Sequence, residues 1–309
     1  MSRAVAAAVR ELLPTPTATA ALAAALWDGD EGRAVFERWS AHVGDPRDLP
    51  PDERHVLREL APQLDAARRR VGARAPGALG VLLHAATVHE RRRWASYRAA
   101  AVDLLAGEAE PLVSGGLAVA LSAHAEPAER HCHDLDRLGR DPRNESHPSG
   151  LPGVVHAGLL PPGWTAEEDL DAIRGRSAPD DRLGRPVRRI GVGDLLVAVL
   201  VHHVAGRRWG SVRWASDAWL LAASASDADW ACFTGTVVGQ RLGPVVLPSL
   251  RYVADDLRGA VPVAVRDAVA ASPPPDAERA RRALAWAHRH RSPTPTRRLV
   301  RAVRRRLTT

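Results

Sequence analysis

Apolar residues recur at intervals of three and four through the first third of the chain, the spacing of helices that bury one face. The clearest stripe runs from Val56 to Val71 and predicts a helix that Pro62 kinks or divides. The segment 45–53, rich in proline and aspartate, is expected to be a loop. Further helices are predicted before Pro14 and at 18–27, 31–43 and 78–106.

The pattern changes at a glycine pair, Gly115-Gly116, which follows a short apolar run. We expect a strand before the pair, a tight turn at the pair itself, and a helix that begins near Leu117. A second strand then carries Asp134 and Asp136. This order of strand, turn, helix and strand indicates a short α/β unit in an otherwise helical chain.

The segments after this unit have weaker patterns. We expect a third strand at 154–156, preceded by a loop over 141–153 that is rich in proline, serine and glycine. Residues 164–190 are polar and lack a clear period, so they are predicted to be irregular. The exception is a short helix at 166–173, for which Thr165 is the expected cap.

The last part of the chain is again helical in pattern, with helices predicted at 194–204, 211–225, 230–241, 248–257 and 263–271. Arg213 and Asp217 stand four residues apart and are expected to pair on the surface of the second of these helices. The predicted fold class is α+β and helix-rich, with a small mixed β-sheet flanked by N- and C-terminal helical regions. The predicted regions are an N-terminal helical region at 1–108, an α/β core at 109–163, a C-terminal helical region at 164–272 and a basic tail rich in proline and arginine at 273–309.

The basic residues narrow the chemistry, because all of them are arginine. The formal net charge is +7 and the chain contains no lysine. A bound phosphate or carboxylate must therefore be held by arginine, by backbone N–H groups or through a metal. The segment 297–307 predicts a basic amphipathic helix, but no base-reading motif accompanies it, and we do not expect nucleic acid as a partner. The excess of alanine, arginine, proline and glycine indicates GC-rich coding, which is typical of bacteria.

The cysteine content and the apolar runs bear on the compartment. Cys132 and Cys232 do not make a disulfide framework, which favours a reducing environment, so we expect a cytoplasmic protein. The apolar run at 4–9 is interrupted by Arg10, unlike the core of a signal peptide. The alanine-rich run at 18–26 is too short to span a bilayer, and no transmembrane segment is expected.

The glycine pair and the aspartate pair together suggest a chemistry. Residues two apart on a strand point to the same side, so Asp134 and Asp136 would project together as hard oxygen ligands. Such a pair suits Mg²⁺, or Mn²⁺, held jointly with substrate phosphates. Gly115 and Gly116 lack Cβ and allow a phosphate to approach the backbone, where the helix N-terminus favours an anion. These are the parts that phosphoryl or nucleotidyl transfer requires.

Two sets of segments resemble a known family. The first set, SGGLAVAL followed by HDLD, resembles the glycine turn and the Asp-x-Asp strand of the nucleotidyltransferase superfamily that includes DNA polymerase β. The second set occurs in the order HPSGLPGVVHAGLL, GDLLVAVLVHH, VRWASDAWLL and DADW, and resembles the motifs of a bacterial uncharacterised nucleotidyltransferase family. The resemblance covers roughly residues 10 to 265.

The resemblance implies an α/β core of nucleotidyltransferase type and a transfer from a nucleoside triphosphate to a small-molecule or peptide acceptor, in natural-product biosynthesis. Asp134 and Asp136 match the metal ligands of the family, with Mg²⁺ or Mn²⁺ as the ion. His156 matches the histidine of its third strand and is a further catalytic candidate.

The nucleotide-binding candidates come from two of these segments. Ser114, Gly115 and Gly116 form the phosphate turn that the resemblance implies. Arg213 lies in the segment that resembles the Arg-Trp helix of the family and is a candidate for substrate contact, with a purely structural role as the alternative.

Two departures from the family pattern keep other functions open. The third carboxylate of the family would lie two residues before His156, where this chain has Val154. Only 17 residues separate Asp136 from Val154, where the family has a helix and another strand, so we expect a shortened sheet. One alternative is therefore a catalytically degenerate binding protein. Another is a fold reused for other chemistry, such as zinc binding, through His131, His133 or His156.

Overall fold

The computed structural model describes residues 2–160, 164, 170–205 and 211–274. Its first third is helical, as the apolar stripes predict. The helix at 51–70 continues through Pro62, so the predicted division there is wrong. Leu60 and Leu64 on either side of the proline are buried in the same core, and this packing holds one helix together. The bounds of the N-terminal helices are Ser2–Arg10 (α1), Pro16–Leu26 (α2), Gly29–Val43 (α3), Pro51–Arg70 (α4) and Gly77–Leu104 (α5).

Six strands form one mixed sheet in the order β3-β4-β2-β1-β6-β5. The central strand β1 pairs antiparallel with β2 and parallel with β6, and β2 pairs parallel with β4. The expected strand, turn, helix and strand are confirmed, with helix α6 at Gly115–Ala123 and a short 3-10 helix η1 at Pro127–Glu129. The strands are Leu112–Val113 (β1), Leu135–Leu138 (β2), Arg143–Ser146 (β3), Pro152–His156 (β4), Ala178–Asp180 (β5) and Val187–Arg189 (β6).

Three strands lie where the sequence predicts loop or irregular structure. β3 falls within the predicted loop 141–153 and pairs antiparallel with β4, so the interval between Asp136 and Val154 contains a strand but no helix. β5 and β6 fall within 164–190 and extend the sheet on its other side. β3 and β5 are edge strands in which no residue is fully buried, so they lack the apolar and polar alternation of a half-buried strand.

The C-terminal helices agree with the predicted ones within a few residues, apart from a π-helical turn, η2, at Tyr252–Asp256. The predicted cap Thr165, residues 166–169 of the short helix, and the tail from residue 275 lie outside the described residues. The bounds are Leu170–Arg176 (α7), Val192–Ala205 (α8), Arg213–Ser224 (α9), Asp227–Gly239 (α10), Gly243–Arg251 (α11) and Val263–Ala270 (α12).

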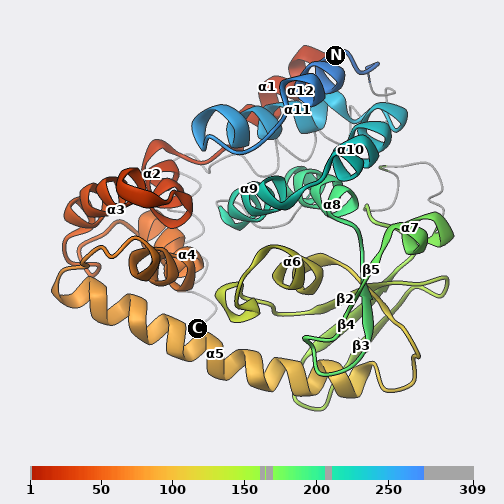
Figure 1. The fold of residues 1–309 in the computed structure, drawn as a ribbon, viewed down its shortest axis with the longest axis horizontal. Helices are drawn as coiled ribbons and strands as arrows, with labels where there is room; N and C mark the ends of the chain where they lie inside the picture. Colours follow the sequence, from red (N-terminus) through yellow and green to blue (C-terminus); the bar gives the residue numbers. More distant parts are fainter. Residues whose placement is uncertain (1, 161–163, 165–169, 206–210, 275–309) are drawn as a thin grey trace, which may run out of the picture.

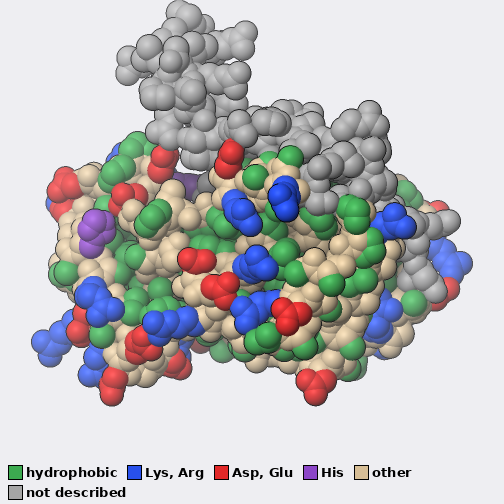
Figure 2. All heavy atoms as spheres, turned by 90° about the horizontal axis from the view of Figure 1, so that it is seen from above, with side chains coloured by type: hydrophobic (Ala, Val, Ile, Leu, Met, Phe, Trp, Pro, Cys, Tyr) green, Lys and Arg blue, Asp and Glu red, His purple; other side chains and the backbone are tan. Residues whose placement is uncertain are grey.

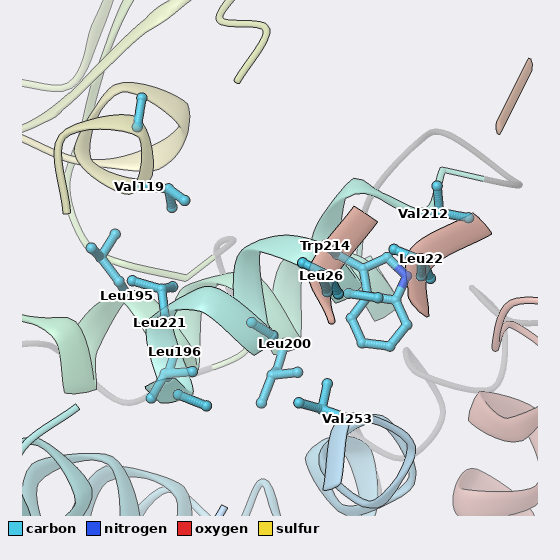
Figure 3. Packing of buried hydrophobic residues seen from close by; sticks show 14 of the residues in the cluster. Leu22, Leu26, Val119, Leu195, Leu196, Leu200, Val212, Trp214, Leu221 and Val253 are labelled. Carbon is cyan, nitrogen blue, oxygen red and sulfur yellow. The ribbon is translucent and has the colours of Figure 1, made fainter. Parts of the chain in front are cut away.

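The sheet, α6 and the helices above it form successive layers (Figure 1). α6 packs against β2 on one side and against α8 and α9 on the other. α5 runs along the edge of the molecule from α4 to the sheet (Figure 1). Figure 3 shows the apolar contact between the layers, where Val119 of α6 lies near Leu195 of α8 and Leu221 of α9. These layers bring helices from both ends of the described chain over the N-terminus of α6.

Most of the described buried apolar residues belong to one cluster, which extends from α1 to α12. α1 packs against α11, so the N-terminal and C-terminal helical regions share this core. The helix-rich α+β class with a small mixed sheet is thereby confirmed. Among the described helices, none combines the length and the apolar character needed to cross a membrane.

Charges of both signs share the surface on the face shown in Figure 2, where arginine and carboxylate side chains are interspersed. This arrangement matches the ion pairs on the described surface, such as Arg258 with Glu31 at 2.6 Å and Arg266 with Asp255 at 2.7 Å. A nucleic-acid backbone requires a continuous basic strip. This face does not present one.

Candidate functional site

The glycine turn and the second aspartate are in direct contact. Gly115 begins α6 with φ of +54°, a conformation that favours glycine. A Cβ at this position would lie 2.8 Å from the Cβ of Asp136 and 2.9 Å from its Cγ, closer than van der Waals contact. The backbone N–H of Ser114 donates to the carbonyl of Asp136 at 3.0 Å, which fixes the turn to β2. Glycine is therefore required here both by the backbone conformation and by the aspartate beside it.

The residues that the sequence singled out share one cavity of about 610 Å³. It lies between the sheet, the N-terminus of α6 and the helices α8 and α9. Asp136 faces the glycine turn, whereas Asp134 lies just before β2, which begins at Leu135, so only one of the two predicted aspartates is on the strand. The predicted residues in the cavity wall are Ser114, Gly115, Gly116, Asp134, Asp136, His156 and Arg213.

His156 is bonded to the second aspartate. β4 runs parallel to β2, with Val154 opposite Asp136 and His156 opposite Leu138. The His156 Nε2 lies 2.9 Å from Asp136 Oδ1. This hydrogen bond raises the pKa of His156 above its ordinary value, although partial burial acts to lower it. The sequence placed both residues in the site, but their pairing depends on strand register and could not be deduced from spacing.

Arg130 is the main residue of the site that sequence reasoning did not assign. Its Nε and Nη2 donate to both oxygens of Asp217 at 3.0 and 2.8 Å. Its Nη1 lies 2.5 Å from the place that a Cβ on Gly116 would occupy, so one edge of the guanidinium faces the glycine turn. Its place just before the Asp-x-Asp strand was visible in the sequence. The partner is 87 residues away, so the sequence did not indicate it.

Asp217 is buried, with 2% of its surface exposed, and its main partner is Arg130. Burial acts to raise the pKa of this carboxyl, but the charge of Arg130 and hydrogen bonding outweigh burial and hold the pKa at about 2. The predicted surface pair of Arg213 with Asp217 is therefore wrong, because α9 turns this face into the core.

Arg213 lines the same cavity and binds elsewhere. Its Nη1 donates to the carbonyl of His131 at 3.3 Å, and its Nη2 lies 3.7 Å from Glu59 Oε1 on α4. Burial lowers the pKa of Arg213, but a guanidinium keeps its proton at neutral pH. Arg130 and Arg213 therefore bring two positive charges to the wall of one cavity. His203, which is half-buried, stacks on Trp214, the residue that follows Arg213, with ring centroids 3.9 Å apart, and desolvation lowers the pKa of His203 to about 3.

Asp134 and Asp136 are the carboxylates that the sequence predicts to hold a metal ion. Asp134 and Asp136 lie in the same cavity wall, and Mg²⁺ is commonly bound through one or two carboxylates plus substrate phosphates. Neither of the acids that follow β2 joins the pair. Glu145 on β3 binds Arg137, whose side chain alternates with Asp136 along β2 and so lies on the other face. Asp141 is not among the described residues of the cavity wall.

The histidines considered for zinc have different polar partners in the fold. His131 Nδ1 lies 2.8 Å from Glu90 Oε1, whereas His133 Nε2 lies 3.2 Å from Asp134 Oδ2. His156 faces Asp136. Across residues 2–160, 170–205 and 211–274, no group of three or more His, Cys, Asp and Glu side chains is arranged to hold a metal ion.

The chain was compared with models of protein families, with characterised proteins and with solved structures, and it matched none of them. The nucleotidyltransferase resemblance therefore rests on the motifs in this sequence. What the fold adds is the position of those motifs: a glycine turn, two aspartates, a histidine and two arginines around one cavity.

Proposed function

We propose that the protein is a nucleotidyltransferase-like enzyme. It transfers a nucleotidyl or phosphoryl group from a nucleoside triphosphate to a small-molecule or peptide acceptor. The observation that supports this function best is the packing of Asp136 against the glycine turn at Gly115, with Asp134 in the same cavity wall. A carboxylate pair beside exposed backbone N–H groups at a helix N-terminus can bind a metal and a phosphate chain together.

Each side of the cavity has its own part in this proposal. Asp134 and Asp136 would hold Mg²⁺, which would offset the charge of the phosphates and orient them. The turn supplies the backbone N–H groups of Gly115 and Gly116 at the start of α6, because the N–H of Ser114 is bonded to Asp136. The Nη1 edge of Arg130, held in place by Asp217, provides a charged donor beside that turn.

His156 has the properties of a proton acceptor for the acceptor substrate. Its hydrogen bond to Asp136 raises its pKa, so its neutral form is a stronger base than free histidine. Val154 stands opposite Asp136, where the resembling family has a third carboxylate. In this chain, His156 would therefore accept the proton that the third carboxylate would accept in the resembling family.

The position of Val154 also favours a second candidate function. With an apolar side chain opposite Asp136, the cavity has one fewer metal ligand than the resembling family. A protein that binds a nucleotide or a peptide without transfer would have the same glycine turn and arginines. Binding of a nucleoside triphosphate that does not depend on Mg²⁺ would support this candidate.

Substitution of the two aspartates tests the proposal. Nucleoside triphosphates labelled at the α- and γ-phosphates are incubated with Mg²⁺ and a panel of hydroxylated and peptidic acceptors, and labelled products are counted. We expect Asp134→Ala and Asp136→Asn each to abolish labelling while the thermal unfolding curve shows a folded protein. Asp255→Asn is the matched control, because Asp255 lies in an exposed pair with Arg266 far from the cavity wall. Full labelling by both aspartate variants would rule out the mechanism.

A further inference from the structure

A second cavity, of about 400 Å³, lies among the N-terminal helices. Its walls come from α2, α3 and α4, from the segment before α2, and from Ser211 and Val212 before α9. The volume is within the range of sites that bind small organic molecules. Most of the lining is apolar and includes Leu12, Leu13, Ala18, Ala21, Trp39, Val43, Leu49, Val56 and Leu57.

The two cavities are neighbours across a thin partition. Ser211 lines both of them. Glu59, which lines the first cavity, accepts hydrogen bonds from Ser211 Oγ at 3.0 Å and from the Val212 N–H at 2.9 Å. One turn earlier on α4, His55 and Val56 line the second cavity. A molecule in the second cavity would therefore lie next to whatever occupies the first, as the second substrate of a transferase must.

Among the described residues that line it, the second cavity has carboxylates but no arginine. Glu11, Asp52 and Glu53 line it, whereas the first cavity is lined by two arginines, Arg130 and Arg213, together with four carboxylates. Among the described residues of the second cavity, His55 alone can carry a positive charge, and its Nε2 lies 3.5 Å from Glu59 Oε1. Glu53 is half-buried against the apolar walls, which reduces the screening of its charge by solvent, whereas Glu11 and Asp52 are exposed. The second cavity therefore disfavours a triphosphate and favours a cation with an apolar body.

We propose that this second cavity binds a small apolar molecule that carries an amine. Its role as the acceptor site rests on the proposed transferase function, but the binding of the amine does not. The apolar walls bury the body of the molecule, and the half-buried carboxylate of Glu53 selects the ammonium group.

The experiment compares 4-phenylbutylamine with 4-phenylbutyrate, which share one apolar body and differ in charge. Each is titrated calorimetrically into the full chain without nucleotide. We expect the amine to bind at least about tenfold more tightly than the acid, because a like charge beside the carboxylates is repelled. Glu53→Gln should reduce this preference severalfold, because it weakens the binding of the amine. Equal binding of the two probes, or no binding of the amine, would overturn the proposal.

A pair of variants on α2 locates the site. Thr17 is half-buried and lines the second cavity, whereas Ala20 on the same helix is exposed and does not line it. Thr17→Trp should fill the cavity and lower the affinity for the amine at least about tenfold, since most of the apolar contact with the amine is lost. Ala20→Trp should leave its affinity unchanged. Unchanged binding in Thr17→Trp would overturn the proposal.

The Asp136→Asn variant separates this inference from the proposed function. The variant should bind 4-phenylbutylamine as tightly as the wild-type chain, because Asp136 is not part of the second cavity. Loss of the amine in Asp136→Asn would place the probe in the first cavity and overturn the inference. Amine binding by a wild-type chain that labels no acceptor would uphold the second cavity while refuting the transferase.

Discussion

Substitution of Gly115 by alanine tests the contact between the glycine turn and the aspartate. Gly115 is the first residue of α6 with φ of +54°, and Gly29 is the first residue of α3 with φ of +63°. A Cβ on Gly29 would meet no atom within 4 Å. A Cβ on Gly115 would lie 2.8 Å from the Cβ of Asp136. Gly29→Ala therefore measures backbone strain alone, and Gly115→Ala measures strain together with displacement of Asp136.

The structure sets the size of the two effects. An L-residue in the left-handed region costs about 1–2 kcal/mol, which we expect for Gly29→Ala. Asp136 cannot retreat easily, because β2 is paired on both sides, with β1 and with β4. Overpacking of this kind adds about 1–3 kcal/mol, so Gly115→Ala should cost about 2–5 kcal/mol in all. Displacement of the carboxylate should also lower turnover by about 10²-fold, as small misplacements of reacting groups do.

The assay is urea unfolding of both variants, together with calorimetric titration of a nucleoside triphosphate and Mg²⁺. A double-mutant cycle adds a direct measurement of the coupling between Gly115 and Asp136. Asp136→Ala removes the carboxylate next to Gly115, so the stability cost of Gly115→Ala should shrink in the Asp136→Ala background. If Gly115→Ala matches Gly29→Ala in stability, keeps nucleotide affinity and shows no coupling to Asp136, then the turn and the aspartate are not in contact and the reasoning is refuted.

The remaining predictions concern buried charge. Asp217→Asn removes the anion that pairs with Arg130 inside the protein and should lower the free energy of unfolding by about 3–5 kcal/mol. Asp255→Asn, the control in an exposed pair, should lower it by less than about 1 kcal/mol. Equal losses of the two variants in urea unfolding would contradict this prediction. The folded-state pKa of Asp217, about 2, is below its ordinary 3.8. The ionised carboxyl therefore stabilises the fold by about 2 kcal/mol above pH 3.8, and this contribution should be lost as the pH falls to 2. The difference in the free energy of unfolding between the wild-type chain and Asp217→Asn, measured against pH, would reveal the loss. Burial and Asp194 raise the pKa of Cys232 to about 11, so its alkylation by iodoacetamide at pH 8, followed by mass spectrometry, should be about 100-fold slower than that of a free cysteine.

The elements and residues that the sequence determined by itself are those with local causes. Apolar stripes depend on neighbours three and four residues away, so the helices of the first third and α8 to α12 could be predicted. The glycine pair and the two aspartates were identifiable because their chemistry depends on residue type and short spacing. The cavity wall that contains Gly115, Asp134 and Asp136 could therefore be anticipated before the fold was known.

Tertiary structure alone decided the features that depend on distant partners. The edge strands β3 and β5 are short and polar, and only pairing with β4 and β6 makes them strands. Arg130 belongs to the site because α9 brings Asp217 to it from 87 residues away. The two cavities become neighbours only because α4 and the start of α9 meet at Glu59. Non-local pairing and burial leave no periodic trace along the chain, because each depends on which surfaces the packed layers bring together.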